Sequence, residues 1–293
     1  MSNALVPILR TLLICLSGLL YNGCQLATAQ SATDATPAED DRASWQSLFN
    51  GRDLEGWTPN FAGQPVGVNF RNTFRVEDSV LRVSYADYTS FDDAYGHLYY
   101  RNPYAHYKLR FEYRFTGDQV PGGASWNVRN SGVMLHAQSA ESNEIGQTFP
   151  VSIELQLLGG LSDGKERPTG NVCTPGTAVV LTDTIDYRHC ISSTSKTYDG
   201  DSWIRAEAIV RGGGQMDFLI EGDTVLQFTR PQIGGGFIYR SREQADWQAA
   251  GIHSSRQEWL DRDGELLTRG YIALQAESHG IDFRRIELLD LSQ

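Results

Sequence analysis

Carboxylate and amide side chains alternate with apolar residues in a segment that is predicted to be a strand. In residues 151–157, Ile153 and Leu155 alternate with Glu154 and Gln156. Successive side chains of a strand point to opposite faces, so one face would be apolar and the other would carry an acid and an amide. Strand propensity alone favours Thr or Val over Glu and Gln at these central positions. The pattern therefore indicates a functional polar face.

Two further segments show the same alternation. Residues 270–277 place apolar side chains on one face and Gln275 and Glu277 on the other, before a turn at Ser278, His279 and Gly280. Residues 131–136 are expected to direct Val133 and Leu135 inward. If these strands share a sheet, their polar side chains form one surface, made of His136, Glu154, Gln156, Gln275, Glu277 and Arg284. The alternative is a merely solvated face, which we favour for Arg110, Glu112 and Arg114 in residues 107–115.

Strand signals dominate the elements that must position these side chains. Short stretches rich in β-branched and aromatic residues, bounded by Gly, Asp, Asn or Pro, predict strands at residues 73–76, 80–85, 107–115, 131–136, 151–157, 177–181, 203–211, 215–220, 224–228, 270–277 and 281–291. Helical periodicity is confined to residues 43–49 and 241–250. The lack of crossover helices argues against a parallel α/β sheet. We therefore predict an all-β fold, a two-sheet antiparallel β-sandwich.

Long irregular stretches interrupt the strands at residues 158–174 and 230–269. Loops of this length in a compact domain are usually functional rims or lids. The alternative for the second stretch is decoration or an oligomer contact.

The N-terminus resembles a targeting segment. Arg10 precedes an apolar run at residues 12–20 that is too short to span a bilayer comfortably, and Ala27-Thr28-Ala29 offers small residues for cleavage. This predicts a signal peptide over residues 1–29, cleaved near Ala29, and a periplasmic or secreted protein. Lipid attachment at Cys24 is the alternative. Residues 30–44 are expected to be a flexible leader, and residues 45–293 one domain.

Charge and cysteine content limit the partners further. The formal net charge of −11 argues against nucleic acid and anionic membrane surfaces as partners.

Only Cys173 and Cys190 lie outside the predicted signal peptide. An exported protein with two cysteines is expected to pair them, which would close a loop of about 18 residues and contribute roughly 3 kcal/mol. A Cys/His metal site that uses His189 is the alternative, but a second cysteine pair is missing.

Four motifs resemble the 3-keto-disaccharide hydrolase domain family. They are Leu48-Phe49-Asn50-Gly51 followed by Leu54-x-Gly56-Trp57, Asn130-Ser131-Gly132, Glu154-x-Gln156, and Leu274-Gln275 followed by His279-Gly280. The resemblance runs from Ser47 to Leu288, nearly the whole mature chain. It implies a concanavalin A-like jelly roll and an enzyme that cleaves glycosides or disaccharides already oxidised to a ketone at C3.

The implied chemistry needs a base, an acid and a group that polarises the ketone. A C3 carbonyl acidifies the C2 proton, so the C1 substituent can leave by β-elimination and water can add back. Hydrolysis and elimination both remain open. We expect Glu154 and His279 to be the acid–base pair, with His136 as the alternate.

The remaining roles follow from the same resemblance. Asn130, Gln156, Gln275 and Glu277 would bind sugar hydroxyls, and Arg284 or Lys196 would stabilise an enolate. A divalent metal ion held by Glu and His ligands is an alternative for this last role, although no His-Glu-x-x-His motif occurs.

The sequence departs from the common family pattern in one region. Residues 168–177 and 188–197 indicate a subgroup that carries a disulfide, and Asp201-Ser202-Trp203-Ile204 replaces the usual Gly-Glu-Trp-Asn. The alternative function is a non-catalytic carbohydrate-binding module of the same fold. Glu154 with His279 favours the enzyme, because binding alone needs no base.

Overall fold

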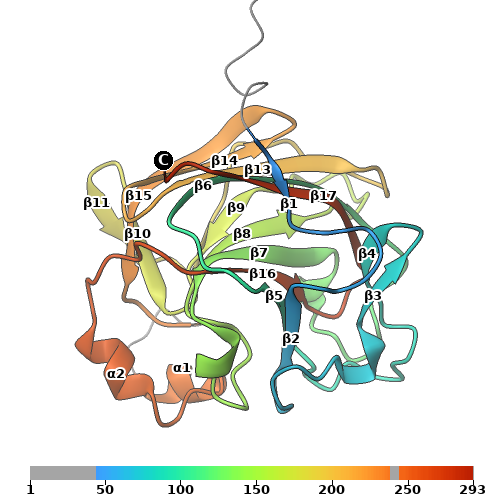
Figure 1. Ribbon diagram of the computed structural model, residues 1–293, viewed down its shortest axis with the longest axis horizontal. Coiled ribbons are helices and arrows are strands. Elements are labelled where there is room, and N and C mark those ends of the chain that lie inside the picture. The colour runs from blue at the N-terminus through green and yellow to red at the C-terminus, as the bar shows by residue number, and fades with distance from the viewer. Residues whose placement is uncertain (1–43, 238–243, 293) are drawn as a thin grey trace, which may run out of the picture. The chain divides into compact units, whose positions relative to one another are not determined.

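The computed structural model describes residues 44–237 and 244–292, and these form two antiparallel sheets (Figure 1). The predicted signal peptide, Cys24 and all of the predicted leader except Ser44 lie outside the described residues. Among the described residues, no helix is long and apolar enough to cross a membrane.

The larger sheet has ten strands. Their order is β11-β10-β15-β14-β13-β6-β17-β4-β3, with β1 paired to β17. Their bounds are β1 (Gln46–Ser47), β3 (Phe74–Glu77), β4 (Val80–Val83), β6 (His106–Phe115), β10 (Thr177–Leu181), β11 (Thr184–Asp186), β13 (Ile204–Arg211), β14 (Gln215–Ile220), β15 (Asp223–Ile233) and β17 (Ile281–Asp290).

The smaller sheet has seven strands in the order β12-β9-β8-β7-β16-β5-β2. Their bounds are β2 (Trp57–Phe61), β5 (Gly96–Tyr100), β7 (Asn130–Ala137), β8 (Ile153–Leu158), β9 (Asn171–Cys173), β12 (Cys190–Ile191) and β16 (Tyr271–Ala276). The helices in the described residues are the 3-10 turns η2 (Phe70–Asn72), η3 (Ser125–Asn127) and η4 (Ala140–Ser142), and the short α-helices α1 (Gln244–Ala249) and α2 (Arg256–Asp261).

The core lies between the two sheets and follows the predicted alternation. Strand β6 buries every second residue, from Tyr107 to Phe115, whereas its intervening residues are partly exposed. Strands β7, β8 and β16 bury Leu135, Leu155 and Leu274 with their neighbours in the same cluster. Each such side chain contributes about 1.5–3 kcal/mol when it is withdrawn from water. The predicted fold class, an all-β two-sheet antiparallel sandwich of the jelly-roll type, is confirmed.

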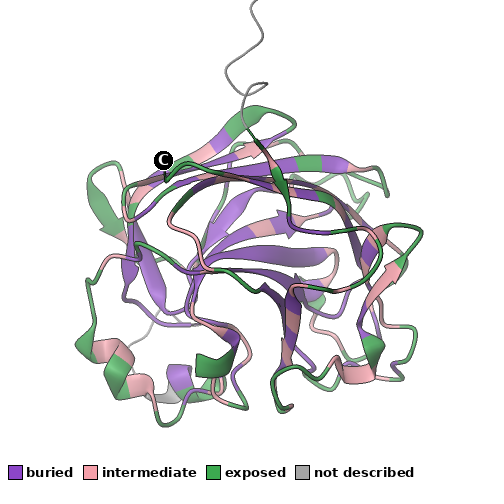
Figure 2. Cartoon of the chain, in the orientation of Figure 1, coloured by how far each residue is buried: buried purple, intermediate pink, exposed green. Residues whose placement is uncertain are grey.

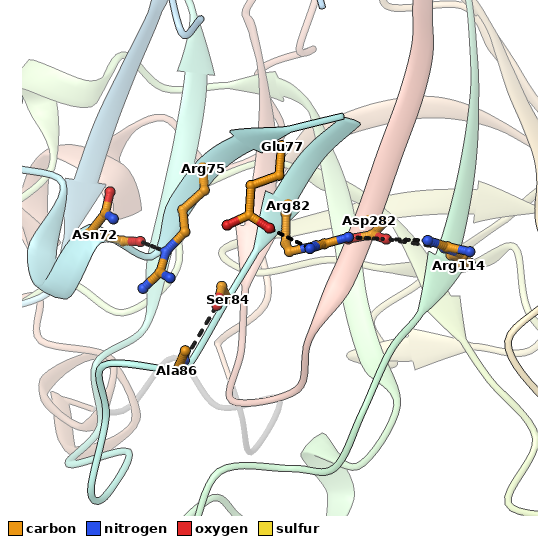
Figure 3. Close-up of polar contacts among 8 residues, drawn as sticks. All are labelled: Asn72, Arg75, Glu77, Arg82, Ser84, Ala86, Arg114 and Asp282. Atoms are coloured by element: carbon orange, nitrogen blue, oxygen red, sulfur yellow. Dashed lines mark hydrogen bonds and ion pairs between the residues drawn. The ribbon is translucent and has the colours of Figure 1, made fainter. Parts of the chain in front are cut away.

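The outer face of the larger sheet is polar and ion-paired, as expected for β6. Asp282 is fully buried between Arg82, whose Nε lies 2.8 Å away, and Arg114, whose Nη2 lies 2.9 Å away. Figure 3 shows this row crossing from β4 through β17 to β6. Arg284 belongs to the same face, because its Nε donates to Glu112 at 2.6 Å.

The outer face of the smaller sheet is buried, unlike that of an ordinary solvated sheet. Strand β7 is buried along its whole length, and Figure 2 shows β7, β8 and β16 almost entirely in the buried colour. The loop that carries Ala140 and Phe149 covers Tyr99, Met134 and Ala273 on this face. Polar side chains on this face are therefore held away from water, which sets their chemistry.

The chain changes sheet after β16. Ser278 has a φ of 75°, and its backbone N–H donates to the Tyr85 hydroxyl at 2.7 Å. The left-handed conformation redirects the chain, so β17 joins the larger sheet. The predicted strand, turn and strand are present, but the two strands belong to different sheets.

Several sequence-based predictions were wrong or incomplete. Residues 43–49 contain β1 instead of a helix. Strands β2, β5, β9, β11 and β12 and helix α2 were missed. Strand β5 is buried at all five residues, so it shows no alternation. Strand β2 contains Pro59, which is tolerated because β2 lies at the edge of its sheet.

Candidate active site

A cavity of about 550 Å³ opens on the outer face of the smaller sheet. Strands β7 and β8 supply Asn130, Glu154 and Gln156, and Glu277 follows β16. The surrounding loops supply the walls, which include Trp126, Phe149, Leu161, Arg167 and the Cys173–Cys190 disulfide. Polar groups from three neighbouring strands therefore meet at the base of a cavity whose walls are partly apolar.

Glycine at position 132 makes room for the Glu154 side chain. Gly132 pairs with Gln156 on the neighbouring strand, two residue pairs from Met134 and Glu154 and on the same face of the sheet. A Cβ atom on Gly132 would lie 2.3 Å from Glu154 Oε1 and 2.7 Å from Glu154 Cγ. The absence of a side chain at this position lets the carboxyl group extend over β7.

Glu154 and Glu277 form a buried carboxyl pair. Glu154 is 5% exposed and Glu277 is 2% exposed. Burial raises the pKa of Glu154 to about 8. Burial, together with the negative charge of Glu154, raises the pKa of Glu277 well above its usual range. Two close carboxylates cannot both ionise readily, so one group of the pair can carry a negative charge while the other keeps a proton.

A chain of amides fixes the hydrogen-bonding groups beside this pair. Asn171 Nδ2 donates to Gln156 Oε1 at 3.0 Å, and Gln156 Nε2 donates to Asn130 Oδ1 at 3.4 Å. Asn130 Nδ2 in turn donates to the Trp126 carbonyl at 3.3 Å. The amides are therefore oriented by one another before any ligand binds.

Trp126 presents an aromatic surface at the rim of the cavity. It lies in η3 and is 54% exposed. A ring of the Trp126 indole stands nearly parallel to the Tyr95 ring, with an interplanar angle of 11° and ring centroids 6.5 Å apart. An exposed indole that is supported in this way can cover the apolar face of a bound ring.

Arg167 brings a positive charge to the cavity wall. Its guanidinium donates to the carbonyls of Val128 at 2.7 Å, Arg129 at 3.0 Å and Gly159. These acceptors are neutral, so they orient the charge without cancelling it. Burial, with the nearby positive charge of Arg129, lowers the pKa of Arg167. A ligand oxygen with developing negative charge would be stabilised here.

The structure brings together only some of the predicted site residues. Asn130, Glu154, Gln156 and Glu277 line the cavity. Gln275 lies on the same sheet, as predicted, but it is buried opposite His97 of β5 and does not line the cavity. Lys196 is exposed, with its Nζ 4.9 Å from the centre of the Tyr198 ring.

The expectation that His279 lies beside Glu154 is not met by this geometry. The turn at Ser278 carries His279 onto Phe115 of the larger sheet, where the ring centres lie 5.7 Å apart. Burial and the positive charge of Arg129 lower the pKa of His279 to about 4. The residue is outside the cavity lining.

His136 and Arg284 are also displaced from the predicted surface. The pairing of β7 with β16 shifts near His136, which has a φ of 49°. This irregularity breaks the alternation, and His136 Nε2 instead lies 3.2 Å from the Gly212 carbonyl. Arg284 is on the opposite sheet and is paired with Glu112. The prediction of one shared surface was therefore wrong for both residues.

The predicted disulfide between Cys173 and Cys190 is present, with an S–S distance of 2.04 Å. Of the two long stretches, residues 158–174 do form part of the cavity rim, through Leu158, Leu161, Arg167 and Cys173. No residue from 230–269 lines this cavity within the described part of that stretch.

Trp126, Phe149 and Arg167 are cavity residues that sequence reasoning missed. Arg167 could have been suspected from its place in a long loop. Trp126 and Phe149 carry no local signal, because an isolated aromatic residue in a loop is as common in a satellite core as at a binding site.

The described residues contain no group of three or more His, Cys, Asp or Glu side chains able to hold a metal ion. The metal alternative, which requires Glu and His ligands together, lacks that donor set in this part of the chain.

A two-sheet jelly roll with a polar cavity on one sheet defines a class of proteins that includes lectin domains. Within it, the chain belongs to the family described as the 3-keto-alpha-glucoside-1,2-lyase-like domain, whose model matches residues 44–289. This match confirms the family predicted from the motifs.

Solved structures agree on the fold. Two crystal structures of candidate glycosyl hydrolases from Parabacteroides distasonis ATCC 8503 are similar, each with a TM-score of 0.50. The first is 18% identical in sequence, and the match covers 88% of this chain and 98% of that protein's chain. The second is 17% identical, and the match covers 85% of this chain and 100% of that protein's chain. No curated protein sequence matches the chain.

Proposed function

We propose that the protein cleaves glycosides oxidised to a ketone at C3, by elimination across C1 and C2. The buried pair of Glu154 and Glu277 in the cavity carries this proposal, because one of two close carboxyl groups can be ionised while the other keeps its proton. Such a difference is what separates an acid from a base at one site. The family to which the chain belongs and its candidate glycosyl hydrolase neighbours support the same class of reaction.

Glu154 acts as the base and Glu277 as the acid. The Glu154 carboxylate removes the C2 proton, and the C2–H electron pair enters the enolate of the C3 ketone. The enolate then forms the C1=C2 double bond as the C1–O bond breaks, and Glu277 gives its proton to the leaving oxygen. Glu154 ends protonated and Glu277 ionised, so one proton must pass between them before the next turnover.

Water addition to the product follows the same route in reverse. An ionised Glu277 can activate water for attack at C1, while protonated Glu154 returns a proton to C2. The sum of both half-reactions is hydrolysis. Elimination and hydrolysis therefore differ only in whether the unsaturated product leaves before water adds.

The cavity walls position the substrate for this chemistry. Arg167 is placed to stabilise negative charge on the C3 oxygen in the enolate. Asn130 and Gln156 offer oriented amides to sugar hydroxyls, and Trp126 covers one face of the ring. Secretion, with cleavage near Ala29, remains part of the proposal because the substrate would be an extracellular glycoside.

Incubation of the protein with 3-keto-trehalose tests this function, with unoxidised trehalose as the matched control. Parallel reactions should contain a metal chelator. We expect release of glucose from the keto sugar alone, slowed when the C2 hydrogen is replaced by deuterium. Cleavage of unoxidised trehalose at the same rate would contradict the role of the ketone. Binding of either sugar without cleavage would favour the carbohydrate-binding module.

A further inference from the structure

The Cys173–Cys190 disulfide lies in the same row of the sheet as Glu154. Glu154 of β8 is directly paired with Cys173 of β9, and Cys173 is directly paired with Cys190 of β12. Directly paired residues project from the same face of a sheet. Both cysteines line the cavity that contains Glu154. The disulfide therefore forms part of the wall of the cavity that contains the Glu154 carboxyl group.

The other neighbour of Glu154 in this row is also a sulfur-containing, apolar side chain. Met134 of β7 pairs with Glu154 on the side opposite Cys173 and is fully buried. A thioether and a disulfide offer only weak hydrogen-bonding groups. Neither neighbour of Glu154 in this row therefore offers a group that solvates a negative charge well.

Strand β12 is short and is anchored at Ile191, which packs in the core, and at Ser193, whose N–H donates to Asn171 Oδ1 at 2.9 Å. It comprises two residues at the edge of the smaller sheet. Around it, the Thr174 N–H donates to the His189 carbonyl at 2.8 Å, and Thr174 Oγ1 donates to the Arg188 carbonyl at 3.1 Å. The preceding strand β11 is mostly exposed. The disulfide is the covalent link that joins this segment, with His189, to β9 at the cavity wall.

We propose that the Cys173–Cys190 disulfide is a positioning element of the active site. It holds β12 as one wall of the cavity, and this wall keeps water from Glu154. Reduction of the disulfide releases β12 and lets water into the cavity. The assignment of Glu154 as a base rests on the proposed function, whereas the shielding of its carboxyl group does not. The raised pKa of Glu154 is consistent with such shielding.

The reduction is chemically accessible from one side. Cys190 is exposed and Cys173 is buried. A thiolate can attack Cys190 Sγ, forming a mixed disulfide and releasing Cys173 as the thiolate; a second thiol then displaces Cys190. Two thiols are oxidised to one disulfide, and the protein gains two thiols. The co-reactant is thus a small dithiol or monothiol reductant.

Of the other ionisable groups at the cavity, two stay in place in this step and one moves. Glu277 follows β16, Arg167 lies in the loop before β9, and His189 precedes β12. Glu277 and Arg167 keep their chain connections when the bond opens, and His189 moves with β12. A fall in the pKa of Glu154 on reduction would therefore report entry of water, since water stabilises the charged form.

The test is a carboxyl titration by NMR of the full chain labelled with glutamate carrying ¹³C in the side-chain carboxyl group. The Glu154 signal is assigned by its loss in Glu154→Gln. We expect its midpoint to fall by at least one pH unit after reduction with dithiothreitol and in the double variant Cys173→Ala/Cys190→Ala. An unchanged midpoint in a reduced protein that is still folded by circular dichroism would overturn the proposal.

Two controls separate shielding from general stability. Val210→Ala weakens the core far from the cavity and should lower the melting temperature without moving the Glu154 midpoint; an equal shift in this variant would refute the local effect. If the double variant does not fold, Cys190→Ala takes its place, because this variant retains the buried Cys173 side chain. The Glu154 midpoint should show the same fall in Cys190→Ala. Because no readout depends on turnover, failure of the proposed function leaves this test intact.

Discussion

The position of Gly132 is matched to the side chain of Glu154: a methyl group on Gly132 would lie 2.3 Å from Glu154 Oε1. Real Cβ atoms do not approach other atoms so closely, so the carboxyl group would have to move. The motif Asn130-Ser131-Gly132 therefore preserves the geometry of a carboxylate that comes later in the chain.

Gly132→Ala should reduce turnover of 3-keto-trehalose by about tenfold or more, because a misplaced base loses much of its effect. Overpacking should also cost about 1–3 kcal/mol of unfolding free energy. Steady-state kinetics and thermal unfolding measure the two effects. Gly146→Ala is the matched control, since its nearest neighbour would lie 3.9 Å away. Full activity of Gly132→Ala would show that Glu154 need not occupy this position.

Glu154→Gln and Glu277→Gln should each lower kcat by about 10²-fold or more while sugar binding survives. Each substitution keeps the shape of the side chain but removes its proton transfer. The double variant should lose less than the product of the single losses, because the two groups act as a unit. His279→Ala provides the comparison, since His279 lies outside the cavity. A larger loss in His279→Ala than in Glu154→Gln would restore the histidine as the base.

The rate should rise as the pH increases through about 8, because burial raises the pKa of Glu154 to about 8 and the base works only when ionised. The rate should fall again at higher pH when Glu277, whose pKa is raised by burial and by the negative charge of Glu154, loses the proton that the leaving group requires. A profile of kcat/KM against pH measures both limbs. A rate that is already maximal at pH 5 and flat to pH 9 would be incompatible with this pair.

Trp126→Ala should weaken binding of the keto sugar up to about tenfold, since an aromatic contact contributes about 0.5–1.5 kcal/mol. Trp126→Phe keeps an aromatic face and should retain most of the affinity. Calorimetric titration of the Glu154→Gln protein separates binding from turnover. Equal affinities in both variants would place the sugar elsewhere in the cavity.

Asp282→Ala should destabilise the fold by about 2–3 kcal/mol, because it removes charge-assisted bonds from Arg82 and Arg114 to a fully buried acceptor (Figure 3). Denaturant unfolding measures the change. Lys165→Ala breaks an exposed pair with Asp163 and should change the stability little, because water screens the pair. Similar losses in both variants would mean that the Asp282 pairs are no stronger than surface pairs.

The sequence by itself determined the sandwich, most of its strands and part of the site. Alternation has a period of two, so it assigned Leu155 to the core and Glu154 to the opposite face without reference to the rest of the fold. These results depend on local geometry, which a single segment contains. The cysteine pair was predicted in a different way, from the count of two cysteines outside the predicted signal peptide.

Only the tertiary structure decided which of the polar residues meet. An irregularity near His136 and a left-handed turn at Ser278 remove two histidines from the expected surface, and sheet order places Arg284 on the far side. The pairing of Glu154 with Glu277, and their burial under distant loops, likewise depends on long-range contacts. A carboxyl group acquires an unusual pKa from what surrounds it in space, and alternation along one strand does not specify those surroundings.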